Sequence, residues 1–340
     1  MSALPIGPAA WWRLGLGLAA AALAAAFAVH FMTSMPGKSH TGLHPPLSAE
    51  ERLLRDRLER HVGTLAGEIG ERSLWNPAGL EAAARYVRDA FEREGWQVTE
   101  QPYRVEGRQV RNVEAAKPGI SRPREIVLVG AHYDSLAGTP GANDNATGTA
   151  ALLELARLLK GRPLARTLRL VAFVNEEPPF FHTDVMGSRV YARRARQRNE
   201  NVVAMLSLET IGYYTDRPGS QSYPAGLGLF YPGTGNFIAF VGNLSSRELL
   251  RRAIRAFRES TPFPSEGGAV PSWVMGAGWS DHWSFWEEGY RAIMVTDTAL
   301  FRYPYYHSPQ DTPDKVDYES MARVVSGLAH VVADLADGSP

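Results

Sequence analysis

Side chains that can bind metal ions or transfer protons follow three apolar runs in this sequence, at the point where each run ends. These side chains are histidines and carboxylates. Two further side chains of these types lie in the loop after the first run and near the C-terminus. Several carboxylates at one edge would repel one another and take up protons unless cations neutralised them. The residues are His132 and Asp134 after the first run, Asp144 in the loop that follows, Glu176 and Glu177 after the second run, Glu209 after the third, and His307 near the C-terminus.

The absence of cysteine restricts the chemistry of these positions. The chain of 340 residues contains no cysteine, which excludes thiolate zinc sites, cysteine nucleophiles and disulfides. Nitrogen and oxygen ligands without sulfur suit zinc, and manganese or cobalt less specifically. Two such ions, about 3.5–4 Å apart, can share a bridging water and hold a carbonyl group from both sides. The pattern therefore predicts a pair of metal ions that act on a carbonyl group.

Strands alternating with helices position these residues. The almost wholly apolar run 125–131 is typical of a central strand covered on both faces, and 168–174 and 202–208 are predicted to be strands of the same sheet. Helices are predicted at 146–159 and 188–197. This alternation predicts a three-layer α/β/α sandwich around a mixed, mostly parallel sheet, with the site at the carboxyl ends of its strands. Further predicted elements are a helix after Ser48, helices at about 79–95, 247–259 and 318–335, and strands at 97–105 and 292–295.

The first 33 residues predict an N-terminal hydrophobic helix. Trp11-Trp12-Arg13 precede an apolar run at 14–32. The run fits a secretory signal peptide, with Ala26-Phe27-Ala28 as cleavage site, or an uncleaved signal anchor, since about 19 residues can just span a bilayer. The tryptophan pair favours the anchor. A buried soluble helix is disfavoured because the run is apolar on all sides and lies at the start.

The domain organisation follows from composition. Residues 1–33 form the signal anchor or signal peptide, 34–48 are predicted to be a tether because they hold little apolar content, and 49–340 are predicted to form one domain. Either form of the N-terminal segment places that domain on the periplasmic or extracytoplasmic side, anchored or secreted. Lys+Arg and Asp+Glu are both 36, so the balanced charge excludes a basic surface for nucleic acid. The oligomeric state stays open.

The motifs resemble those of the co-catalytic di-zinc aminopeptidases, the family of aminopeptidase Y and of secreted bacterial leucyl aminopeptidases. Glutamate carboxypeptidase and glutaminyl cyclase are relatives of that family. The resemblance covers roughly residues 75–335 and implies a zinc-exopeptidase fold for the domain. It rests on five segments in order: Ala131-His132-Tyr133-Asp134-Ser135, Gly141-Ala142-Asn143-Asp144-Asn145, Asn175-Glu176-Glu177, Ser207-Leu208-Glu209-Thr210 and Tyr306-His307-Ser308.

The resemblance implies a role for each ligand. His132 and Glu209 would hold one zinc ion. Glu177 and His307 would hold the other, and Asp144 would bridge the two. Glu209 departs from the pattern of the family, where aspartate usually ends the third strand, but it remains an oxygen ligand.

The same resemblance implies the residues that act beside the metals. Glu176 would be the general base that deprotonates the bridging water, and Asp134 would fix the imidazole tautomer of His132. The leucyl aminopeptidases carry an oxyanion-stabilising tyrosine at the position of Ala277, four residues before the Ser-Asp-His segment at 280–282. The possible substitutes are Tyr305, Tyr306 and Trp279; His182 and His282 are predicted to be structural, Asp281 to be a hydrogen-bonding support, and Asp311 and Asp314 to order the His307 loop.

These roles predict metal-dependent hydrolysis of peptide bonds at a chain terminus, by an aminopeptidase acting on a peptide or aminoacyl substrate. A glutaminyl cyclase-like acyltransferase would use one zinc ion and lack the ligand that His132 supplies. A carboxypeptidase would need a basic residue for the substrate carboxylate, and none can be assigned. A non-catalytic ectodomain is disfavoured by Glu176 and the full ligand set. The loops at 212–236 and 261–279 either shape the specificity pocket or are ordinary surface loops.

Overall fold

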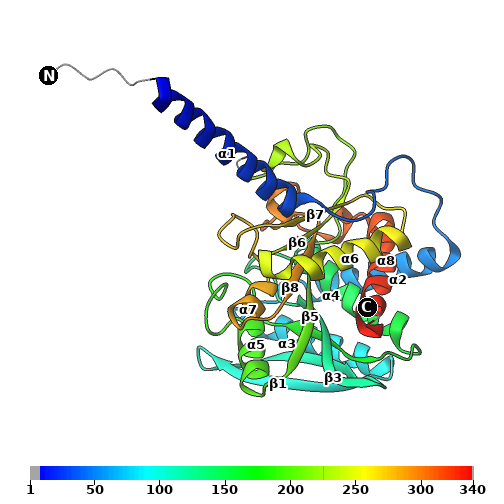
Figure 1. Ribbon diagram of the computed structural model, residues 1–340. Helices are drawn as coiled ribbons and strands as arrows, with labels where there is room; N and C mark the ends of the chain where they lie inside the picture. The colour runs from blue at the N-terminus through cyan, green and yellow to red at the C-terminus, as the bar shows by residue number, and fades with distance from the viewer. Residues whose placement is uncertain (1–7, 225, 339–340) are drawn as a thin grey trace.

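The computed structural model describes residues 8–224 and 226–338, and in this part of the chain eight strands form one mixed sheet (Figure 1). The strand order is β1-β2-β4-β3-β5-β8-β6-β7. The central strands β4, β3, β5 and β8 are parallel, whereas β1 and β2 form an antiparallel hairpin and β6 runs antiparallel to β8. The strands are β1 (Gln97–Val105), β2 (Arg108–Lys117), β3 (Arg122–His132), β4 (Arg166–Phe173), β5 (Asn201–Glu209), β6 (Ile238–Gly242), β7 (Ser265–Ala269) and β8 (Ala292–Thr296).

Helices cover both faces of the sheet, which confirms the predicted three-layer sandwich. Side chains of β3 alternate between the two cores: Val127 and Val129 pack in the larger core, and Ile126 and Leu128 pack beneath α5 and α7 on the other face. The larger core contains α2, α3, α4, α6 and α8. The helices are α1 (Pro8–Thr33), α2 (Ala49–Val62), α3 (Pro77–Arg93), α4 (Thr147–Leu159), α5 (Gly187–Gln197), α6 (Arg247–Ser260), α7 (His282–Glu287) and α8 (Tyr318–Asp337), with short helical turns at Gly63–Ile69 and Ala142–Ala146.

The N-terminal helix α1 projects from the body of the molecule beside β7 (Figure 1). Its segment Trp12–Thr33 is 22 residues long, has a mean hydropathy of 2.0 and contains no buried residue, so it is long and apolar enough to cross a membrane. The predicted anchor segment also includes residues 1–7, which lie outside the described residues.

Residues 34–48, predicted to be a tether, lie along the body between α1 and α2. Arg251 donates a hydrogen bond to the carbonyl oxygen of Ser34, and the Arg258 guanidinium donates to that of Pro36 at 3.0 Å. The amide of Ser265 in β7 donates to the Ser39 hydroxyl at 2.9 Å. Leu47 is buried at the end of this segment. The first part of the segment is thus docked on α6 and β7, whereas residues 41–46 are exposed.

Candidate active site

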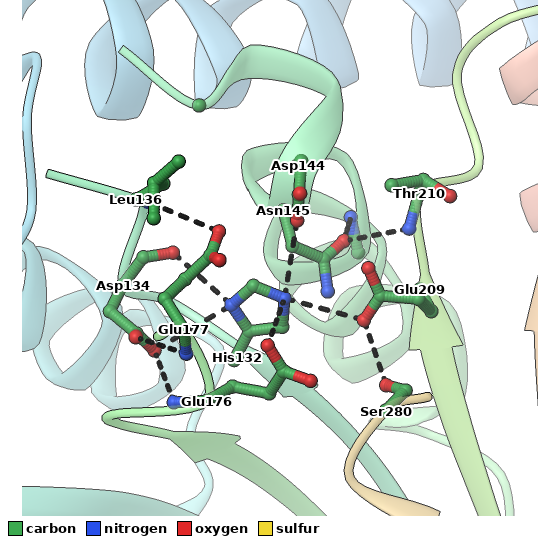
Figure 2. A network of polar contacts seen from close by, with 12 residues as sticks. His132, Asp134, Leu136, Asp144, Asn145, Glu176, Glu177, Glu209, Thr210 and Ser280 are labelled. Atoms are coloured by element: carbon green, nitrogen blue, oxygen red, sulfur yellow. Dashed lines mark hydrogen bonds and ion pairs between the residues drawn. The ribbon is translucent and has the colours of Figure 1, made fainter. Parts of the chain in front are cut away.

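The predicted site residues meet at the carboxyl ends of the central strands. His132 is the last residue of β3 and Glu209 is the last residue of β5. Glu176 and Glu177 follow β4, and Asp144 lies in the helical turn that leads into α4. Figure 2 shows these five side chains pointing toward one another around the imidazole of His132. His307, from the loop after β8, completes the cluster.

Asp144 lies between the two histidines. Its Oδ1 is 3.4 Å from Nε2 of His132, and its Oδ2 is 3.2 Å from Nε2 of His307. Glu209 approaches the first of these nitrogens, with Oε2 at 3.3 Å, and Glu177 approaches the second, with Oε2 at 3.1 Å. The cluster therefore divides into two groups that share one carboxylate.

Several atoms of this cluster are buried without a hydrogen-bond partner among the described residues. They are Nε2 of His132, Oδ1 of Asp144 and Nε2 of His307. Ligand atoms of His132, Asp144 and Glu177 all lie within 4.8 Å of one another, and so do those of His132, Glu176 and Glu209. Buried polar atoms normally have partners, so these atoms indicate a missing ligand. The nitrogen and oxygen donors fit zinc.

The charges of the cluster are poorly balanced by the protein itself. Burial, followed by the charge of Asp144, raises the pKa of Glu177 to about 7. Burial likewise raises the pKa of Glu209, and raises that of Glu176 well above its usual range although His132 opposes the effect. Burial lowers the pKa of His132, but the charges of Glu209 and Glu176 outweigh it and raise that pKa. Such a cluster favours the binding of divalent cations.

Asp134 positions both neighbours in the cluster. Its Oδ1 accepts a hydrogen bond from the amide of Glu176 at 3.3 Å, and its Oδ2 accepts one from the amide of Glu177 at 3.2 Å. Nδ1 of His132 lies 3.2 Å from the Asp134 carbonyl oxygen and 3.6 Å from its carboxylate. A proton on Nδ1 therefore points at the carbonyl and leaves Nε2 free to bind a metal. The carbonyl oxygen of Asp134 is thus nearer to Nδ1 of His132 than its carboxylate is, and the carboxylate holds the amides of the two glutamates.

Further contacts fix the orientation of two carboxylates. The Leu136 amide donates to Oε1 of Glu177 at 3.1 Å, which leaves Oε2 turned toward His307. The Ser280 hydroxyl donates to Oε2 of Glu209 at 2.7 Å (Figure 2). Ser280 therefore holds the carboxylate of Glu209, which was predicted to be a metal ligand.

The loop that carries Asp144 is held by Asp311. One oxygen of Asp311 accepts from the amide of Asn143 at 2.8 Å and from the hydroxyl of Tyr303 at 2.7 Å. The other accepts from the amide of Asp144 at 3.1 Å. Asp311 was predicted to order the His307 loop, and the structure shows that it joins that loop to the Asp144 loop. Asp314 is exposed and bonds locally to Thr312 and Lys315.

Arg72 is a site residue that sequence reasoning missed. Its buried guanidinium donates to the carbonyl oxygens of Tyr133 at 2.7 Å and Gly141 at 2.8 Å, at the two ends of the loop between His132 and Asp144. Burial lowers its pKa to about 10, so the side chain remains charged at neutral pH. No local pattern marks a single arginine with this role.

The remaining histidines lie outside both groups. His182 stacks between Phe181 and Trp283 and hydrogen-bonds to the carbonyl oxygen of Gly278 at 2.9 Å. His282 bonds to the carbonyl oxygen of Ala277 at 2.8 Å. Asp281 is buried and is in neither group of potential ligands found in the described residues.

A cavity that is open to solvent adjoins Glu209. Its walls are mainly apolar and come from both predicted pocket loops, and also from β6, β7 and the turn after β8. Tyr306 and Trp279 line it, whereas Tyr305 does not. Burial first, and then the nearby charges of Asp144 and Glu177, raise the pKa of Tyr306, which keeps its hydroxyl protonated. Tyr306 also stacks on His307 with ring centroids 3.9 Å apart, so its ring is held beside the cluster.

Comparison with known proteins agrees with this geometry. YfbL from Escherichia coli (strain K12) is 39% identical over 282 residues, which are 80% of this chain and 86% of the relative. Aminopeptidase YwaD from Bacillus subtilis (strain 168) is 28% identical over 60% of this chain and only 40% of its own length.

Solved structures share the fold at low sequence identity. A zinc aminopeptidase from Bacillus subtilis, BSAP, superposes with a TM-score of 0.68 at 15% identity and covers 84% of this chain and 95% of its own. A glutaminyl cyclase from Bacteroides thetaiotaomicron has a TM-score of 0.61 at 17% identity and covers 88% and 100%. A family model described as Peptidase family M28 matches residues 112–332, which hold every member of the metal-ligand cluster. The chain belongs to peptidase family M28.

Proposed function

We propose that this chain is a zinc-dependent aminopeptidase whose site holds two metal ions. One group of ligands is His132 and Glu209, and the other is His307 and Glu177. Asp144 contributes one oxygen to each group, and this division of its two oxygens between two histidines is the observation that carries the proposal. When bound, the ions supply Lewis-acid polarisation of a carbonyl group and lower the pKa of water.

Glu176 is the proposed general base. Its side chain is buried, and Oε2 lies 3.8 Å from Nε2 of His132, the longest of the contacts that this nitrogen makes with carboxylates. Its amide is held by Asp134, which fixes the start of the side chain. Glu176 takes a proton from the attacking water and returns it to the leaving amine. Tyr306, whose hydroxyl stays protonated, donates a hydrogen bond to the developing oxyanion.

The cavity beside Glu209 supports action at an amino terminus. None of its described lining residues is lysine or arginine, so it offers no partner for a substrate carboxylate. Its only carboxylates are Glu209 and Glu266, which suit a free ammonium group near the metals better than a carboxylate. The apolar walls then receive the first side chain of the peptide. The names of the aminopeptidase relatives support the same assignment.

We also propose that α1 anchors the catalytic domain to a membrane, with the domain on the periplasmic or extracytoplasmic side. The support is the exposed apolar segment Trp12–Thr33 and its place at the edge of the body, away from the sheet core.

The test compares two substrates that differ only at the amino group, and adds a peptide with an amino-terminal glutamine. The full chain in detergent is assayed with leucine p-nitroanilide, N-acetyl-leucine p-nitroanilide and a glutaminyl peptide. We expect release of nitroaniline from the free amine alone, because acetylation removes the ammonium group that the site recognises. Equal cleavage of the acetylated substrate would refute an aminopeptidase, and ring closure of the glutaminyl peptide without hydrolysis would favour the cyclase alternative.

The Glu176→Gln variant tests the mechanism in the same assay. Loss of the general base should reduce kcat by about 10²–10⁴-fold while zinc remains bound. The control is Glu287→Gln, because Glu287 is exposed on α7 and should be silent. Unchanged kcat in Glu176→Gln would remove Glu176 from the mechanism.

A further inference from the structure

Large apolar side chains are exposed on three loops that contribute residues to the cavity wall. Leu229 is 84% exposed and Trp273 is 82% exposed, and three neighbours in these loops are also exposed. Single apolar residues on a surface are ordinary, but a group of them around one opening marks an interaction site. We call this group the apolar rim: Leu229, Phe230, Trp273, Met275 and Leu300.

Four of the five rim residues, all but Leu300, lie in stretches of sequence without charge. No charged residue occurs from 218 to 246 or from 267 to 280, although 21% of the chain is charged. Removing a charged side chain from water costs free energy. Because these two stretches carry no charged side chain, burying their surface costs little free energy. Tryptophan is also the residue most typical of membrane–water interfaces, together with tyrosine.

The rim is next to the point where α1 leaves the body. Gly267 in β7 contacts both regions: a Cβ on this glycine would lie 3.0 Å from the Cγ of Met35, just past the end of α1. On the other side, the Tyr231 hydroxyl donates to the Gly267 carbonyl oxygen at 2.9 Å, and Tyr231 follows the rim residue Phe230. Figure 1 shows α1 leaving the body on the side that carries the loops before β6 and after β7.

The exit direction of α1 is fixed by contacts with α6. The Arg247 guanidinium donates to the carbonyl oxygen of Phe31 at 2.7 Å, and its carbon lies 3.9 Å from the centre of the Phe31 ring. Together with the docked segment at 34–48, these contacts hold the apolar helix and the rim in one orientation. A membrane that contains α1 therefore comes close to the rim.

We propose that the apolar rim lies in the interfacial layer of the same membrane that α1 crosses, an inference that rests on the proposed anchoring. Because α1 already holds the domain at the bilayer, contact of the rim with lipid is intramolecular in effect and needs little affinity of its own. Met275 and Leu300 belong to both the rim and the cavity wall, so the cavity opens toward the lipid surface. The substrate class that fits is a peptide with an apolar amino-terminal residue, adsorbed to the membrane.

The absence of cysteine makes the contact directly measurable. Leu229→Cys and Trp273→Cys, each labelled with an environment-sensitive fluorophore, are compared with Ile120→Cys. Ile120 is 74% exposed, but it lies between β2 and β3, away from the β7 edge of the sheet. The full chain is placed in nanodiscs of phosphatidylethanolamine and phosphatidylglycerol, one chain to a disc, with spin-labelled lipid as quencher.

We expect a blue shift and severalfold stronger quenching at 229 and 273 than at 120. Equal quenching at all three positions would overturn the proposal. A blue shift that requires two chains in one disc would also overturn it, because the rim would then bind a second copy.

A second measurement tests the substrate class. The double variant Leu229→Ser, Trp273→Ser changes two rim residues that do not line the cavity. Its kcat/KM should be unchanged for soluble leucine p-nitroanilide and severalfold lower for an amphipathic peptide adsorbed to vesicles of the same lipids. Equal rates of variant and parent on the adsorbed peptide would overturn the substrate assignment. An inactive parent chain whose labels are still quenched would instead refute the proposed peptidase and leave the membrane contact standing.

Discussion

Two regions of this molecule bury carboxylates and treat their charge in opposite ways. Glu154 of α4 is fully buried beneath α2, where Arg57 and Arg157 each donate to it at 2.7 Å and His61 lies 3.2 Å away. Burial raises the pKa of Glu154, but the hydrogen bonds from His61 and the two arginines outweigh this and lower it to about 2. This carboxylate stays ionised with charges that the chain itself provides.

The metal-ligand cluster lacks such partners. Within the described residues, no lysine or arginine forms an ion pair with Asp144, Glu176, Glu177 or Glu209. The pKa of Glu177 accordingly rises to about 7, where that of Glu154 falls. The difference teaches that the fold can balance a buried carboxylate with its own cations and does so at Glu154. At the strand ends it leaves that balance to ions from solution.

The largest expected effect is the loss of activity and stability when metal ions are removed from the cluster. Dialysis against a chelator should abolish peptidase activity, and zinc should restore it with two ions bound per chain. At a zinc concentration about 1,000 times the dissociation constant, one site adds about 4 kcal/mol to the free energy of unfolding. Metal analysis, activity and thermal unfolding measure this together. Full activity restored by a single ion would contradict the two-ion site.

Neutralising Glu154 should cost stability and spare chemistry. Glu154→Gln removes the negative charge that Arg57 and Arg157 share. Breaking a buried ion pair lowers the free energy of unfolding by about 3–5 kcal/mol. Urea unfolding of the metal-loaded chain measures the loss, and kcat per folded molecule should not change. Glu248→Gln is the matched control, because Glu248 pairs with Arg291 on the exposed surface and should matter little. Equal stabilities of the two variants would show that the Glu154 cluster is not a structural ion pair.

Asp311→Asn should weaken the metal site without touching a ligand. One acceptor oxygen is lost, so either the Asn143 or the Asp144 amide loses its partner and the Asp144 loop is held less firmly. Metal affinity should fall about 10–100-fold, as is usual for groups that orient ligands. Competition with a zinc-binding dye measures it. The control is Asp314→Asn, three residues away and exposed, and a similar loss in both variants would argue against the role of Asp311.

The smallest expected effect is a change in the slope of stability against pH. The folded-state pKa of Glu154 is lowered to about 2 from an ordinary value of 4.5, so the unfolded chain binds more protons between these values. The stability that Glu154 contributes is present above about pH 4.5 and is lost as the pH falls toward 2. Urea midpoints at several acidic pH values should fall less steeply in Glu154→Gln than in the parent. Parallel slopes would contradict the lowered pKa.

Local sequence predicted the central strands because a strand covered on both faces is apolar throughout. The runs at 125–131 and 168–174 became β3 and β4, and the helix predicted after Ser48 is α2, which begins with a capping box at Ser48. β7 escaped prediction because its Gly-Gly pair has no side chains to show a pattern. Gly267 packs closely against α6, since a Cβ there would lie 2.9 Å from the Cδ1 of Ile254.

The site residues could be predicted where a histidine or a carboxylate directly follows a strand. His132, Glu177 and Glu209 could be placed at one edge because each ends or follows an apolar run, and Asp144 because its loop begins a helix. Arg72 could not be placed, because the partners that join it to the site are carbonyl oxygens more than 60 positions away, those of Tyr133 and Gly141. Every residue type has a main-chain carbonyl oxygen, so the sequence does not show which residues accept these hydrogen bonds.

The docked segment at 34–48 has a consequence for how the enzyme meets its substrates. A free tether of this length would let the domain wander by roughly 20 Å. If α1 crosses a membrane as proposed, Arg251 and Arg258 would instead hold the domain at one height above the bilayer. Encounters with adsorbed peptides would then be collisions in two dimensions, set by lateral diffusion along the surface. An insertion of flexible residues after Thr33 would change which peptides are reached and leave the catalytic residues as they are.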